Sequence, residues 1–102
     1  MVKDSGEYAR KLDKRIIKDK RLRKKYGISI EQYDEIVKNQ NNACWICHRP
    51  PKKQSLHVDH NHKTGKIRGL LCHNCNYGMG RYFKEDIDNL RRAAEYLEKF
   101  KE

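Results

Sequence analysis

The sequence has no long run of apolar residues and no apolar signal segment. Only 36% of its 102 residues are hydrophobic, and no apolar run approaches the roughly 20 residues that a transmembrane helix needs. The basic N-terminus is not followed by the apolar core of a secretion signal. We therefore expect a protein that neither spans a membrane nor follows Sec-type secretion, and that resides in the cytoplasm.

The chain also has few residues with which to build a hydrophobic core. A domain of this length buries only about two-thirds of the surface that its unfolded chain exposes, so the core alone is expected to be marginal. Disulfides are rare in a reducing compartment. The four cysteines are therefore expected to stabilise the fold as metal ligands.

Acidic residues are scarce, and the basic excess is unevenly distributed. The chain has 24 Lys and Arg against 14 Asp and Glu, which gives a net charge of +10; residues 1–29 carry +7 and residues 41–83 carry +6. Such an excess is typical of proteins that bind a polyanion, although a solvated helix face gives the same pattern. We expect a basic helical arm over residues 1–29 and a separate domain over residues 30–102.

The hydrophobic pattern predicts helices at both ends and two strands between them. Apolar residues recur every three to five positions up to Tyr26, which predicts a helix ending at Gly27. Ser29 and Gln32 resemble a capping box and open a second helix. Alternation predicts strands at residues 56–59 and 67–71, and periodicity predicts a last helix over residues 86–100.

The four cysteines form two C-x-x-C pairs with the spacing of a metal site. Cys44 and Cys47 are separated from Cys72 and Cys75 by 24 residues. Two such turns can close on one tetrahedral Zn²⁺, and four thiolates leave no position for water, so the ion would be structural. Two disulfides or four buried thiols are the alternatives.

Histidines and a single acid are concentrated between the two cysteine pairs. Asp59 is the only acidic residue in residues 41–83, and His57, His60 and His62 lie within three positions of it. A carboxylate with neutral oxygen ligands suits Mg²⁺ or Mn²⁺, and a neighbouring histidine can take a proton from water at neutral pH. A histidine-rich surface turn is the alternative.

The run LHVDHNHKTGKIRGLLCHNCN, with CWIC upstream, closely resembles the phage recombination endonuclease VII branch of the HNH (ββα-metal) nucleases. The similarity covers about residues 26 to 98. It implies an α+β fold: a small zinc-stapled ββα-metal (His-Me finger) core, flanked by N-terminal and C-terminal helices. For a phage-encoded chain it also implies a location in the host-cell cytoplasm.

The resemblance assigns roles to individual residues. Asp59 and Asn76 would ligate the catalytic metal, His60 would be the general base, and His62 would contact the phosphate or the leaving group. Zn²⁺ would be structural and Mg²⁺ or Mn²⁺ catalytic.

The expected activity is divalent-metal-dependent hydrolysis of DNA, by nicking or by structure-directed cutting of junctions or branches. Lys66 and Arg68, on the second predicted strand, are candidate phosphate contacts. The short C-terminal region leaves both a homodimer and a monomer open. The competing hypotheses are a catalytically silent zinc-knuckle DNA-binding module and a regulator that binds a protein partner through its helices.

Overall fold

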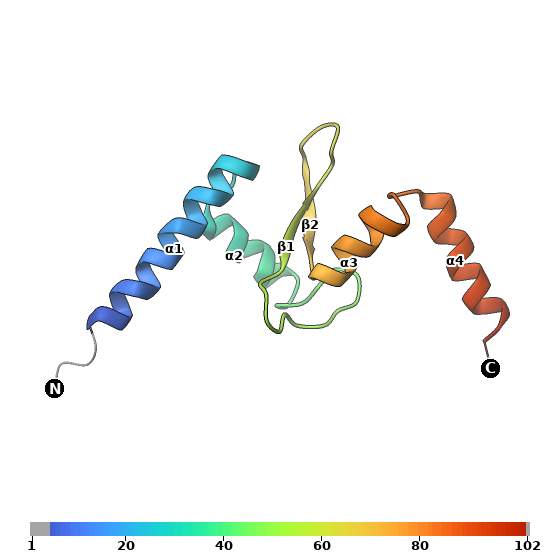
Figure 1. Cartoon of the computed structure of the whole chain (residues 1–102), viewed down its shortest axis with the longest axis horizontal. Helices are drawn as coiled ribbons and strands as arrows, with labels where there is room; N and C mark the ends of the chain where they lie inside the picture. The colour runs from blue at the N-terminus through green and yellow to red at the C-terminus, as the bar shows by residue number, and fades with distance from the viewer. Residues whose placement is uncertain (1–4, 102) are drawn as a thin grey trace.

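The computed structural model describes residues 5–101, and their side chains from Arg10 onward. Residues 1–4 and 102, at the ends of the two predicted regions, lie outside the described residues. The elements, in chain order, are α1 (Ser5–Tyr26), α2 (Ile30–Asn39), β1 (His57–His60), β2 (Ile67–Leu71), α3 (His73–Tyr77), the π-helix η1 (Gly78–Tyr82) and α4 (Ile87–Lys99). The hairpin lies between α2 and α3, while α1 and α4 extend toward opposite ends of the molecule (Figure 1). The predicted α+β class is confirmed.

The junction of α1 and α2 follows the predicted signals. Gly27 ends α1 with a left-handed φ of 72°, and the capping box of Ser29 and Gln32 opens α2. Asp19 of α1 accepts a hydrogen bond from the backbone N–H of Ile30 at 2.8 Å. This bond and an ion pair between Arg15 and Asp34 at 2.7 Å fix the two helices to each other.

The core lies where α1, α2 and the hairpin meet. Its buried residues are Leu22, Ile30, Tyr33, Cys44, Leu56, Val58, Leu70 and Leu71. The side chain of Gln40, just after α2, donates to the carbonyl of Leu70 at 2.9 Å and accepts from its N–H at 3.0 Å. The Tyr33 hydroxyl donates to the carbonyl of Leu56 at 2.7 Å. These polar contacts fix α2 against the hairpin.

The hairpin is antiparallel and contains one irregularity. Asp59 is opposite Gly69 and His60 is opposite Ile67, so Arg68 is an extra residue in the ladder. A bulge of this kind bends the strand and redirects the side chain of the extra residue. The strands are joined by a turn in which the Asn61 side chain accepts from the N–H groups of Lys63 and Thr64.

The two outer helices have exposed apolar faces. Leu12, Ile16 and Ile17 of α1 are 43% to 61% exposed, and Ile87 and Leu97 of α4 are 64% and 70% exposed. The predicted helices form, but only the C-terminal end of α1 is packed into the core, through Leu22. None of the helices within residues 5–101 has the length and apolarity that crossing a bilayer requires.

Candidate active site and candidate zinc centre

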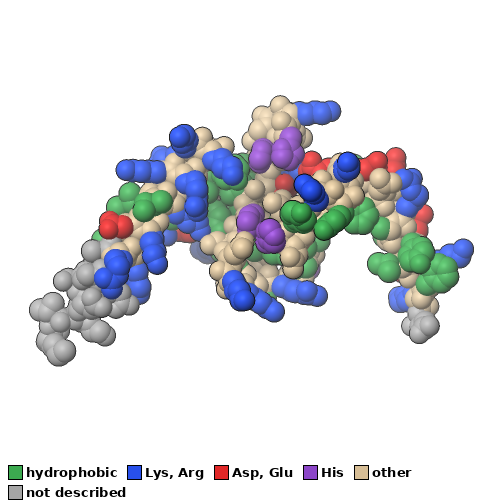
Figure 2. Space-filling view, viewed as in Figure 1, with side chains coloured by type: hydrophobic (Ala, Val, Ile, Leu, Met, Phe, Trp, Pro, Cys, Tyr) green, Lys and Arg blue, Asp and Glu red, His purple; other side chains and the backbone are tan. Residues whose placement is uncertain are grey.

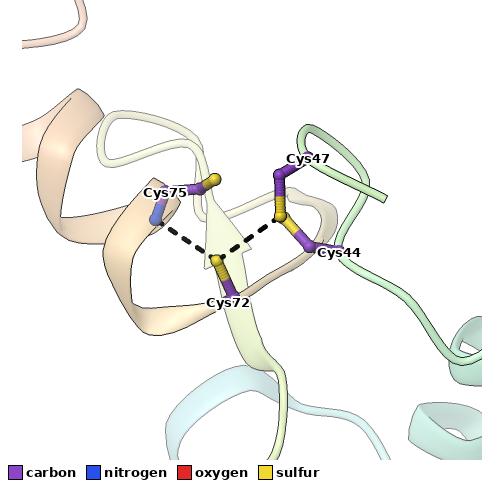
Figure 3. Close-up of side chains that lie close together, drawn as sticks. All are labelled: Cys44, Cys47, Cys72 and Cys75. Atoms are coloured by element: carbon purple, nitrogen blue, oxygen red, sulfur yellow. Dashed lines mark hydrogen bonds between the residues drawn. The ribbon is translucent and has the colours of Figure 1, made fainter. Parts of the chain in front are cut away.

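The structure brings the four predicted cysteine ligands together. The Sγ atoms of Cys44, Cys47, Cys72 and Cys75 all lie within 4.8 Å of one another (Figure 3). The Sγ atoms of Cys47 and Cys72 are 3.9 Å apart. A tetrahedral ion with Zn–S bonds of about 2.3 Å requires sulfur atoms about 3.8 Å apart, so this cluster fits structural Zn²⁺.

The electrostatics of the cluster also favour a bound cation. Burial raises the pKa of Cys44, but backbone hydrogen bonds from Cys47, Cys72 and Ile46 outweigh this effect and lower it to about 6. Burial and the neighbouring sulfurs raise the pKa of Cys75. A thiolate at Cys44 therefore disfavours ionisation of Cys75, and a bound divalent cation would allow all four cysteines to be deprotonated together.

The cysteine cluster fixes the helix that follows the hairpin. Cys72 caps α3, with its Sγ accepting from the N–H of Cys75 at 3.4 Å (Figure 3). Cys44 belongs to the loop after α2, where Trp45 N–H donates to the carbonyl of Leu70 at 3.2 Å. An ion shared by the two pairs would hold α3, and with it Asn76, at a constant position beside the hairpin.

A pocket of about 440 Å³ gathers the predicted catalytic residues. Asp59 and His60 of β1, His62 after it and Asn76 of α3 all line this pocket. The C-terminal end of α1 contributes Lys25 and Tyr26, and the segment after η1 contributes Glu85; the remaining lining residues are Val58, Tyr77, Met79, Gly80 and Arg81. The pocket thus joins residues from four separate parts of the chain.

Asp59 is the buried charged residue of the site. It is 9% exposed, and its carboxylate accepts two hydrogen bonds from the Arg68 guanidinium, from Nε at 2.8 Å and from Nη2 at 2.9 Å. Arg68 also donates to Glu85. The bonds to Asp59 first, and to Glu85 second, raise the pKa of Arg68 above its ordinary value, so it is always charged here.

The histidines divide into two groups. The His60 ring lies 4.8 Å from that of His62 and 5.6 Å from that of Tyr26, between centroids. His62 Nε2 is 3.9 Å from a Glu85 oxygen. His57 lies apart from the pocket lining and is 3.0 Å from Gln54 Oε1 through its Nε2.

Lys66 and Arg68 lie outside the lining of this pocket. Lys66 is exposed in the hairpin turn, and the guanidinium of Arg68 is held by two carboxylates. Their contact with DNA phosphates stays a prediction.

Tyr26, Lys25 and Glu85 were not predicted as site residues. The sequence pattern places Tyr26 on the apolar face of its helix, and no local signal indicates that Glu85 returns to the hairpin. Its return depends on the turn after η1, where Lys84 and Glu85 both have left-handed φ angles, of 50° and 57°.

The fold and the pocket define a class: a hairpin and a following helix, held by a four-cysteine cluster, with an acid, an amide and imidazoles around one hollow. The family model of recombination endonuclease VII matches residues 19–99, and the chain belongs to this family. The resemblance to the endonuclease VII family that the sequence indicates is confirmed.

Two phage proteins show the same similarity. The chain is 45% identical over 75 residues to the Gene 59 protein of Mycobacterium phage D29 and 47% identical over 74 residues to the Gene 59 protein of Mycobacterium phage L5. These matches cover 72% and 71% of this chain, but 46% and 44% of the relatives. The chain thus spans less than half the length of the curated relatives that it matches.

Proposed function

We propose that this protein is a divalent-metal-dependent DNA endonuclease. The observation that carries the proposal is that Asp59, His60, His62 and Asn76, four residues from two elements and a loop, line one pocket. A protein that only binds DNA has no need for this arrangement. The family to which the chain belongs is that of recombination endonuclease VII, and this supports the same class of reaction.

The donor set of the pocket fits Mg²⁺ or Mn²⁺. A carboxylate and an amide oxygen are hard ligands of the type these ions prefer, and Asp59 and Asn76 supply them. When bound, such an ion stabilises negative charge on phosphate oxygens and on the leaving group.

His60 is the proposed general base. Its ring contacts both the Tyr26 ring and the His62 ring, which limits the orientations that it can adopt. An imidazole can accept a proton from an attacking water near neutral pH. His62, which faces Glu85, would contact the phosphate or the leaving group.

The basic surface of α1 fits a DNA backbone. Lys and Arg side chains line the visible face of α1 (Figure 2), and Lys25, in the last turn of α1, lines the pocket. Phosphate contacts orient a duplex without reading its sequence. We therefore propose nicking or structure-directed cutting of junctions or branches, with Lys66 and Arg68 as further phosphate contacts.

We extend the proposal to the biological setting. The matched relatives are phage proteins, which favours action on DNA in the host-cell cytoplasm. The exposed apolar face of α4 would allow a homodimer with two active sites, as symmetric cutting of a junction requires, whereas a monomer would nick one strand.

The test compares His60→Ala with His57→Ala. Both variants remove a histidine from β1, but only His60 lines the pocket. With Mg²⁺ or Mn²⁺, wild type and His57→Ala should cut supercoiled plasmid or a four-way junction, and His60→Ala should be slower by at least about 100-fold.

Equal cutting by wild type and His60→Ala would overturn the assignment of the base. If all three proteins bind the DNA and none cuts it, the silent zinc-knuckle binding module is the better description.

A further inference from the structure

The proposed metal ligand Asp59 is already paired with a positively charged group of the protein, the guanidinium of Arg68. Both carboxylate oxygens accept from the Arg68 guanidinium, at 2.8 Å and 2.9 Å. The bulge at Arg68 is what makes this possible, because it removes Arg68 from the regular ladder position opposite His60. The pair is therefore built into the hairpin.

A carboxylate in this arrangement is not ready for a second cation. A two-pronged guanidinium uses lone pairs that a divalent ion would need, and two cations beside one carboxylate repel each other. Asp59 is 9% exposed, so water screens this repulsion only weakly. Arg68 must leave at least one oxygen of Asp59 before that oxygen can ligate a metal.

Glu85 is placed to receive Arg68. It contacts the same guanidinium, and its other carboxylate oxygen faces His62. The backbones of Lys84 and Glu85 have left-handed conformations that residues other than glycine rarely adopt. Within the turn, the Glu85 N–H donates to the carbonyl of Met79 at 2.9 Å. The chain thus accepts backbone strain in the segment that returns this carboxylate to the pocket edge.

The charges of the three residues fit an exchange of partners. Asp59, Glu85 and Arg68 together carry one net negative charge, which attracts a divalent cation. With a divalent cation bound, the net charge of the group becomes +1, which suits a phosphodiester that carries one negative charge.

We propose that Arg68 neutralises Asp59 until a divalent cation binds, and that Glu85 is a positioning residue that then retains the Arg68 guanidinium at the edge of the pocket. Asp59 thereby exchanges one cation for another without becoming an unpaired buried charge. The inference rests on the proposed function, since it takes Asp59 as a metal ligand.

The test measures Mn²⁺ affinity of the zinc-loaded protein without DNA, by counting free Mn²⁺ with electron paramagnetic resonance. Arg68→Gln removes the competing cation and should bind Mn²⁺ at least about fivefold more tightly than wild type. Arg68→Lys keeps the charge but loses the two-pronged contact, so its affinity should lie between the two. Arg15→Gln is the matched control, because it removes an arginine from the distant pair with Asp34, and it should not change Mn²⁺ affinity.

Glu85→Gln tests the second half of the proposal and leaves the Asp59–Arg68 pair intact. It should weaken Mn²⁺ binding by about fivefold, because Arg68 then has only Asp59 as a partner. In an Arg68→Gln background the same change should have a smaller effect. An undiminished effect there would mean that Glu85 acts without Arg68 and would overturn its positioning role.

The outcomes separate this inference from the function on which it rests. If Arg68→Gln and Arg68→Lys bind Mn²⁺ no more tightly than wild type, the inference is wrong. Should Arg68→Gln fail to fold, Arg68→Lys and Glu85→Gln carry the test, and unchanged affinity in both overturns the inference. Asp59→Asn tests the proposed function itself, since Mn²⁺ binding that survives this change would remove Asp59 from the metal site.

Discussion

The candidate zinc cluster and the candidate active-site pocket are constructed in opposite ways. The cluster is made from two C-x-x-C turns, so each pair of ligands is positioned by local chain geometry. The pocket is assembled from α1, β1 and the turn after it, α3, η1 and the segment that follows η1. Local spacing thus builds the site that holds the fold, while the site proposed for chemistry depends on that fold being formed.

We expect the pocket to depend on the cluster, and the cluster not to depend on the pocket. Cys72 caps α3, and Cys75 and Asn76 belong to it, so the cluster and the pocket share this short helix. Loss of the cluster should therefore disrupt the pocket, whereas changes in the pocket should leave the cluster intact.

Zinc removal should have the largest effect. A chelator that strips the cluster should abolish cooperative thermal unfolding, because we expect so small a core to need the metal for stability. Circular dichroism during a thermal scan measures this. Omitting Mg²⁺ is the control and should leave the melt unchanged while preventing cleavage; a zinc-free protein with a normal melt would contradict the direction of dependence.

Leu70→Ala should be the next most damaging change. Leu70 is fully buried in the core, and truncating its side chain to alanine should lower the free energy of unfolding by about 2–5 kcal/mol. Chemical denaturation of the zinc-loaded protein measures this loss. Leu97→Ala is the matched control, since Leu97 is 70% exposed on α4 and should cost less than about 0.5 kcal/mol.

Asn76→Ala should affect the pocket alone. Loss of the amide ligand should slow cleavage by about 10- to 100-fold, while zinc content and thermal stability stay near those of wild type. Asn74→Ala, on the same helix but outside the pocket lining, should retain activity. A loss of zinc from Asn76→Ala would show that the two sites are not separable in the expected way.

Tyr26→Ala should give the smallest effect. The Tyr26 ring restricts His60, so its removal should lower the turnover number by roughly threefold with little change in KM. Tyr26→Phe keeps the ring and should restore the rate. If Tyr26→Phe is as slow as Tyr26→Ala, the hydroxyl, and not the packing of the ring, is what matters.

The sequence predicts the local features of both sites well. Capping residues such as Ser29, the C-x-x-C spacing and the alternation around Val58 are short-range signals, and the structure confirms the elements that they predict. The gathering of the pocket residues was expected from the family resemblance, and its geometry agrees, while their catalytic roles stay predictions.

The remaining features depend on tertiary structure. Strand alternation does not reveal the bulge that turns Arg68 onto Asp59, because a bulge depends on the pairing of both strands. Glu85 reaches the pocket because Lys84 and Glu85 both adopt left-handed φ angles. Neither residue is a glycine, so the sequence does not mark this turn. Helical periodicity predicts α4 correctly, but it does not indicate what the apolar face of this helix contacts.

The division into an arm of residues 1–29 and a domain of residues 30–102 stays a prediction. The buried position of Leu22 and the start of the family match at residue 19 show that the end of α1 shares the core of the domain.

The most direct measurement of the central claim is the anomalous scattering of Mn²⁺ in crystals of zinc-loaded His60→Ala bound to DNA. The account predicts a manganese peak ligated by Asp59 and Asn76, next to a phosphate, with Arg68 turned toward Glu85. A manganese peak elsewhere, with Asp59 still held by Arg68 and no phosphate in the pocket, would contradict it.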